Sequence, residues 1–209
     1  MKNLLICISI IICLSLFGCC NYKIEGDTTV SSSIKIKQYG YNVNHPNNSR
    51  NIETYDTQTI FDLCKDFISE FNFAVFEHST LNPEKYIHSK ALMEYVRIKQ
   101  NYGETITKES ITDMFFGIQN INWYDDYVVI KVTSCIKIKY GGIINDENLL
   151  VIIQKKNRYF IADWTSTEPL GFDNGLRIKD YKNLNNPNFW ENEKYYIELL
   201  EEAREVVKK

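Results

Sequence analysis

Apolar positions follow three different patterns along the 209 residues of the chain. A predominantly apolar run covers residues 4–17. Between residues 57 and 101, apolar side chains recur every three or four positions, which is the spacing of amphipathic helices. From about Phe115 to Thr165 they alternate with polar side chains, as in strands that bury one face. The order of these patterns predicts helices followed by antiparallel strands.

The strongest helix prediction covers residues 57–78, where the apolar positions keep to one helix face. They are Ile60, Leu63, Cys64, Phe67, Ile68, Phe71, Ala74 and Val75. Such a broad aromatic stripe needs a large apolar surface to cover it. Residues 82–101 predict a short helix with Pro83 at its start, and then a second helix that ends at Gly103.

Four strands are predicted after the helices, over residues 118–124, 127–140, 149–155 and 159–165. The second of them turns one apolar face to the core, made of Val128, Ile130, Val132, Ile136 and Ile138. In the last strand, alternation places Phe160, Ala162 and Trp164 on one face and Asp163 on the other. Ahead of the helices, the alternating residues 34–37 predict one further short strand.

Helices that precede a run of antiparallel strands indicate an α+β fold. The prediction rests mainly on three segments: the helix Ile60–Val75, the segment 82–87 and the strand that ends in Asp163-Trp164. This arrangement resembles the NTF2-like family, also described as a SnoaL-like or cystatin-like cone. In that family a curved sheet wraps the first helix and leaves a pocket between the two. A final amphipathic helix over residues 188–207 is not a fixed part of the family.

The resemblance implies five aromatic residues as candidates for the pocket lining, Phe67, Phe71, Tyr95, Phe160 and Trp164. The alternative is that these rings simply fill the core. On the final helix, the apolar side is expected to hold Trp190, Ile197, Leu200, Ala203 and Val207.

The first residues have the layout of an export signal, with Lys2 before the apolar run and the small Gly18 directly before Cys19. This layout resembles the lipobox of bacterial lipoproteins, which implies that the Cys19 thiol carries a diacylglyceryl group and becomes the mature N-terminus. Two alternatives remain open: an uncleaved membrane anchor, although a span needs about 20 apolar residues, and an ordinary secretory signal in which Cys19 is incidental.

Four parts follow from these observations: the signal peptide 1–18, a lipidated N-terminus with a flexible tether over 19–55, the α+β domain 56–166, and a linker with the C-terminal helix over 167–209. Lipidation would place the domain at the extracytoplasmic face of the cell membrane. A chain of this length suits a single domain.

Composition and motifs narrow the candidate chemistry. The net charge of −3 and the lack of a clustered basic stretch argue against nucleic acid as a partner. We find no catalytic, metal-binding or cofactor-binding motif, so no catalytic residue, metal ligand or cofactor is predicted. His45, His78 and His88 do not fall with a carboxylate in a recognisable pattern. Export permits a disulfide between Cys64 and Cys135, but a small apolar role in the core is favoured.

Three hypotheses for function remain. The first is a non-enzymatic module, held at the membrane by its lipid, that binds another envelope protein or a small apolar ligand. The second is an enzyme, isomerase-like or hydrolase-like, that uses the cone pocket. The third is a structural or immunity-type lipoprotein that docks a partner with its C-terminal helix. A homodimer through the sheet is compatible with each of them.

Overall fold

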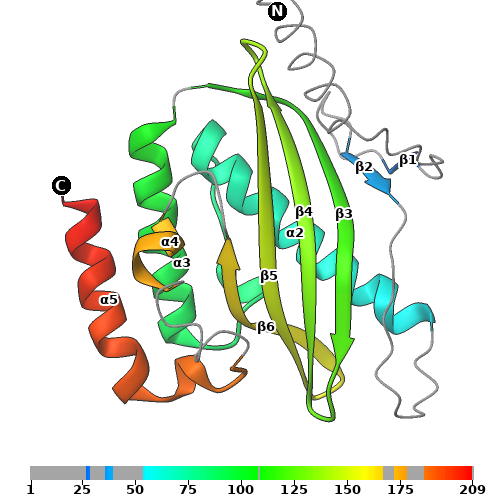
Figure 1. The fold of residues 1–209 in the computed structure, drawn as a ribbon, viewed down its shortest axis with the longest axis vertical. Coiled ribbons are helices and arrows are strands. Elements are labelled where there is room, and N and C mark those ends of the chain that lie inside the picture. The colour runs from blue at the N-terminus through cyan, green and yellow to red at the C-terminus, as the bar shows by residue number, and fades with distance from the viewer. Residues whose placement is uncertain are drawn as a thin grey trace, which may run out of the picture.

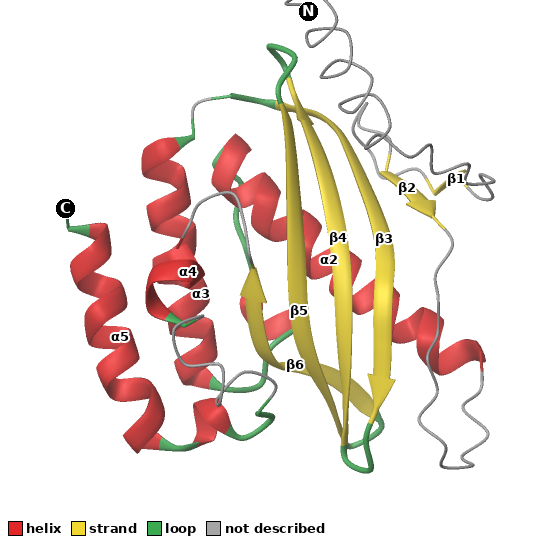
Figure 2. Ribbon diagram, in the orientation of Figure 1, coloured by secondary structure: helices red, strands yellow, loops and turns green. Residues whose placement is uncertain are grey.

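The structure is a computed structural model that describes residues 27–28, 36–39, 54–107, 109–166, 172–177 and 186–208. It confirms the α+β fold: a curved antiparallel sheet with helices before and after it, in a cone-like arrangement (Figures 1 and 2). The predictions for the signal peptide, for Cys19 and for His45 lie outside the described residues.

Six strands form one sheet in the order of the chain. The main part is an antiparallel meander of β3 (Ile111–Trp123), β4 (Tyr127–Ile138), β5 (Ile143–Lys155) and β6 (Arg158–Ser166). Two short strands, β1 (Asp27–Thr28) and β2 (Ile36–Tyr39), extend the sheet beyond β3. β2 runs parallel to β3, and β1 runs antiparallel to β2.

The alternation predicted for the second strand is confirmed in β4, where Val128, Ile130, Val132 and Ile136 are buried and Lys131 and Lys137 are half-buried on the other face. β3 and β5 are longer than predicted. β3 starts at Ile111 and pairs there with Ile138, and β5 starts at Ile143 opposite Lys137. The extra residues mix apolar and polar side chains without a regular alternation, so the hydrophobic pattern did not reveal them.

Helix α2 (Thr54–Glu77) crosses one face of the sheet (Figure 1). Its predicted apolar stripe forms the centre of the core, because every member except the half-buried Leu63 is buried. Asn72, although polar, is also buried, and its amide donates to the Ile68 carbonyl at 2.8 Å. The helix therefore covers the sheet without leaving this buried amide unpaired.

A 3-10 turn, η1 (Pro83–Lys85), and helix α3 (Lys90–Ile106) form the predicted pair. Ser89 caps α3 by accepting a hydrogen bond from the Leu92 N–H. The prediction that the helix ends at Gly103 is wrong. A glycine inside a helix costs only about 1 kcal/mol, and here the Gly103 carbonyl accepts from the N–H of Thr107, which closes the last turn at 3.1 Å.

After the sheet come the short helix α4 (Phe172–Leu176), the 3-10 turn η3 (Phe189–Glu191) and helix α5 (Glu193–Val207). α5 lies beside α3 (Figure 1), and its buried residues are Leu199, Leu200 and Ala203. The placement of Ile197 on the buried side is wrong, because it is 48% exposed. The buried stripe centres on Leu199 and Ala203, which leaves Ile197 beyond its edge.

Among the helices of the described residues, none combines the length and the apolar character needed to cross a bilayer.

Candidate functional site

Four of the five predicted pocket residues are buried in the interior, where they pack against other side chains. The rings of Phe67 and Phe71 both pack edge-on against Trp164, with centroids 4.9 and 4.7 Å away. Tyr95 packs against Phe172 and Trp190. All four rings are at most 4% exposed. Phe67, Phe71 and Trp164 fill the space between α2 and β6, whereas Tyr95 packs between α3 and the C-terminal segments.

Phe160 lies apart from the other four predicted residues. It is half-buried, beside the ring of His88 at 5.6 Å and the guanidinium of Arg158 at 4.9 Å. The prediction that Phe160, Ala162 and Trp164 share a face is wrong because the register between β5 and β6 shifts at Val151 and Ile152. A bulge of this kind inserts one extra residue and reverses the alternation beyond it.

The bulge changes which β6 side chains face the core. Ile161 and Trp164 belong to the main core, whereas Ala162 packs with Val129 and Val151 in a separate small cluster. Asp163 follows the extra residue and is 2% exposed. The sequence reasoning placed Asp163 away from Trp164 and gave it no structural partner.

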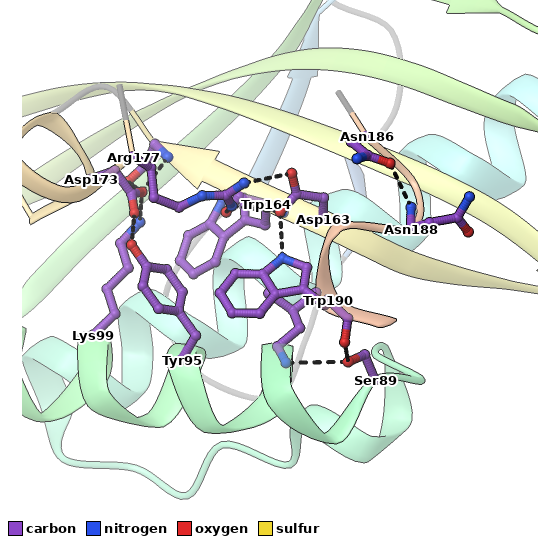
Figure 3. A network of polar contacts seen from close by, with 12 residues as sticks. Ser89, Tyr95, Lys99, Asp163, Trp164, Asp173, Arg177, Asn186, Asn188 and Trp190 are labelled. Atoms are coloured by element: carbon purple, nitrogen blue, oxygen red, sulfur yellow. Dashed lines mark hydrogen bonds and ion pairs between the residues drawn. The ribbon is translucent and has the colours of Figure 1, made fainter. Parts of the chain in front are cut away.

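Two buried ion pairs, which we did not predict, surround Trp164 (Figure 3). In the first, the Lys99 ammonium contacts the Asp173 carboxylate and also donates to the Ser166 hydroxyl at 2.6 Å. The ammonium lies 3.8 Å from the centroid of the Trp164 ring, a distance at which a cation is attracted to an aromatic face. Helix α3, strand β6 and helix α4 therefore converge on one charge.

The Asp173 carboxylate is fully engaged by neighbouring donors. The Tyr95 hydroxyl donates to it at 2.5 Å and the Ser166 N–H at 2.7 Å. Burial alone would raise the pKa of Asp173, but the Lys99 charge and these hydrogen bonds bring it below its ordinary value of 3.8. Burial and the Asp173 charge hold the pKa of Tyr95 well above 10, so its hydroxyl stays a donor.

The second ion pair joins Arg177 to Asp163 through two parallel hydrogen bonds of 2.5 and 2.9 Å. The same carboxylate accepts from the Trp190 indole N–H at 2.7 Å and from the Trp164 backbone N–H at 2.9 Å. The guanidinium also lies over the Phe189 ring, at 4.7 Å from its centroid. Burial lowers the pKa of Arg177, but the charge and hydrogen bonds of Asp163 and the nearby Asp173 charge together contribute to raising it above its ordinary value, so the group stays charged.

These two ion pairs connect the segment that contains Asp173 and Arg177 to helix α3 and strand β6. Buried charges cost several kcal/mol each unless partners compensate them, and here every charge has one. One signal for the first pair was present in the sequence: Leu92, Tyr95, Val96 and Lys99 share one side of a helix, so a lysine sits on an apolar face. A lysine in that position needs a buried acidic partner. Because Asp173 lies far along the chain, the sequence did not show which acidic residue this is.

A shallow polar groove of about 250 Å³ lies where α3 begins. Residues 88–91 bound it on one side, and Trp190, Glu191 and Tyr196 on the other. Within its lining, the Ser89 hydroxyl donates to the Trp190 carbonyl at 3.1 Å. The groove is open to solvent and joins α3 to the C-terminal segment.

The cysteines and histidines do not form a reactive cluster within the described part of the chain. Cys64 and Cys135 are both free thiols, Cys64 buried and Cys135 half-buried. Burial raises the pKa of Cys64, so the thiol is unreactive, as expected for an apolar core residue. His78 and His88 are exposed, and the described residues hold no group of three or more potential ligands placed for a metal ion.

Among the described residues, large apolar side chains are exposed at three places on the surface. Tyr124 lies at the turn between β3 and β4, Tyr140 and Ile143 at the turn between β4 and β5, and Tyr195 and Ile197 on α5. Tyr140 is the most exposed of them, at 79%.

Comparison with known proteins does not assign the chain to a family: no family model matches it, and neither a curated protein nor a solved structure matches it.

Proposed function

We propose that this protein is a lipoprotein, attached through Cys19 to the outer face of the cytoplasmic membrane, whose NTF2-like domain binds a partner protein by its outer surface without catalysing a reaction. The observation that supports the non-enzymatic proposal is that side chains fill the interior of the cone. Phe67, Phe71 and Trp164 occupy the space that a ligand would need in the cone. Binding by the exposed surface is then the simpler way for the domain to act.

An enzyme remains the alternative because the interior is not purely apolar. Tyr95, Lys99 and Asp173 converge within hydrogen-bonding distance, as acid–base residues often do. Their hydrogen bonds, however, go to one another and to Ser166, and the side chains of Lys99 and Asp173 are only 2% and 0% exposed. A substrate would have to displace α4 and break the ion pair before it reached them.

Replacing Cys19 by serine tests the anchoring part of the proposal. The thiol is the atom that receives the lipid, and stable attachment takes at least two acyl chains. We expect the Cys19→Ser protein to move from the membrane fraction to the soluble fraction, with Cys20→Ser as the control that stays with the membrane. A Cys19→Ser protein that sediments with membranes like the parent would refute lipid anchoring.

The exposed side of α5 is the candidate partner surface. Tyr195 and Ile197 are 40% and 48% exposed, one turn from the buried Leu200. Helix α5 itself belongs to the folded domain, since Ala203 and the preceding Trp190 are at most 2% exposed. Deleting residues 188–209 would uncover the core, so point substitutions at exposed positions are the appropriate test.

The double substitution Tyr195→Ala, Ile197→Ala is expected to reduce capture of a membrane partner at least tenfold while the unfolding midpoint changes little, because interface anchors are aromatic and aliphatic side chains. Capture is measured by purifying the lipidated protein from crosslinked membranes. Tyr124→Ala, at an exposed tyrosine far from α5, serves as the matched control. Equal capture by both variants would exclude α5 as the docking helix.

A further inference from the structure

Two turns of opposite charge lie at the same end of the sheet. The β3–β4 turn carries Asp125 and Asp126, and the β5–β6 turn carries Lys156 and Arg158, all four of them exposed. The turns share this end, at the bottom of the view in Figure 1, because β4 begins where the antiparallel β5 ends. Two strand spacings separate the centres of the two hairpins along the sheet, or about 10 Å. One partner surface can therefore contact both turns.

The protein's own residues neutralise these charges only in part. Lys155, at the end of β5, is paired with Glu191 at 3.2 Å. The Arg158 guanidinium donates to a backbone carbonyl, which carries no charge. Within the part of the chain that the structure describes, neither Asp126 nor Lys156 has a hydrogen-bonding or charged partner. One turn therefore presents a negative group to solvent and the other a positive group.

The backbone of the β5–β6 turn would favour a residue other than lysine. Lys156 and Asn157 are its two central residues, with φ of +51° and +59°, as in the type I′ turns that asparagine and glycine prefer. Asn157 fits this preference. Lys156 adopts a left-handed conformation that is unfavourable for most side chains with a Cβ. The positive charge is the property that a lysine adds at this position.

Aromatic side chains accompany both turns. Beside the acidic turn, the rings of Tyr124 and Tyr127 stack with their centroids 4.5 Å apart, and Tyr124 is 49% exposed. Beside the basic turn, the Arg158 guanidinium lies over the half-buried Phe160 ring, at 4.9 Å from its centroid. Tyrosine and arginine are enriched in protein interfaces, where a ring and a guanidinium can stack. Each turn therefore offers what the other one attracts.

We propose that this end of the sheet binds a second copy of the chain, in an end-to-end dimer in which the β3–β4 turn of each copy contacts the β5–β6 turn of the other. The surface of a symmetric dimer has to be complementary to itself, and an acidic and a basic turn side by side meet that condition. The inference goes beyond the proposed function and rests on neither the lipid anchor nor helix α5.

The charges also select the symmetry of the dimer. A two-fold axis perpendicular to the sheet, midway between the turns, exchanges them, so Asp126 of each copy lies opposite Lys156 of the other. An axis in the plane of the sheet and across the strands would instead bring turns of like charge together, which costs free energy. The favourable contact forms twice in the first arrangement, once on each side of the axis.

Charge reversal tests this dimer on the full lipidated chain, in detergent with micelles in excess over protein. Asp126→Lys and Lys156→Asp each place like charges opposite one another at both symmetric contacts. We expect the dimer Kd of either variant alone to rise about tenfold, since exposed charge pairs are individually weak. An equimolar mixture of the two variants should recover the Kd of the parent, because every contact in the mixed dimer again joins opposite charges. Sedimentation velocity over a concentration series measures the Kd.

Lys139→Asp is the matched control, because this exposed lysine lies at the opposite end of the sheet, and it should leave the Kd unchanged. A parent that stays monomeric throughout the series refutes the dimer. Variants that dimerise as tightly as the parent refute this surface and point to another one, such as the outer face of the sheet. A mixture that does not recover refutes the exchange of turns. Loss of the lipid anchor or of partner capture by α5 would alter none of these expectations.

Discussion

Replacing Arg177 by methionine is expected to lower the free energy of unfolding by about 3–5 kcal/mol, because it leaves a buried carboxylate without its cation. The side chains of Arg177 and Asp163 are only 2% and 3% exposed. Methionine keeps much of the stem but provides no donor for the two hydrogen bonds to Asp163. Urea-induced unfolding, extrapolated linearly to water, measures the change.

The same substitution at an exposed ion pair provides the control. Arg204 contacts Glu94 with both side chains almost half exposed, and pairs of this kind contribute at most about 1 kcal/mol. Adding Asp163→Asn to Arg177→Met should recover much of the lost stability, because the unpaired charge is then gone. The prediction fails if Arg177→Met costs no more than Arg204→Met.

The fold followed from the sequence wherever one face of an element was apolar. The stripe Ile60–Val75 and the alternation in β4 predicted elements that the structure confirms, because burial of an apolar face determines both period and orientation. Element ends were less certain. β3 and β5 extend through polar residues such as Asp113 and Asn145, where hydrogen bonds to neighbouring strands continue without an apolar signal.

The candidate site was harder to predict because its partners are distant in sequence. Lys99 and Asp173 are 74 positions apart, and the bulge beside Ala162 turned Asp163 towards Arg177 rather than water. Alternation within β6 carried no sign of this irregularity, which depends on pairing with β5. Four of the five predicted aromatic residues lie in the interior and Phe160 does not, whereas whether such rings line a pocket or fill the core depends on packing in three dimensions.

The buried ion pairs also bear on the proposed role at the membrane. Helix α5, the candidate partner surface, is held in the domain by the hydrogen bond from Trp190 to Asp163 and by its packing against α3. A partner on α5 would therefore be held in a fixed orientation relative to the sheet, which a flexible C-terminal arm would not provide.

Replacing Asp173 by asparagine is expected to lower the free energy of unfolding by about 3–5 kcal/mol at pH 7, because the Lys99 ammonium then stays buried without a counter-charge. The effect should depend on pH. The pKa of Asp173 in the folded protein lies below its ordinary value of 3.8. The stability that its charge provides is therefore complete above that value and is lost as the pH falls through the folded pKa.

Unfolding of the parent and of Asp173→Asn at several pH values tests this reasoning. The difference in free energy of unfolding between the two proteins should stay constant from pH 7 to about pH 5. Below pH 3.8 it should narrow by up to about 1.4 kcal/mol per pH unit. It narrows because the protonated Asp173 and its amide replacement are both neutral. The double substitution Lys99→Met, Asp173→Asn should be more stable than Asp173→Asn alone at pH 7. A gap that stays the same from pH 7 to pH 3 would show that Asp173 stabilises the protein by its shape and hydrogen bonds and not by its charge.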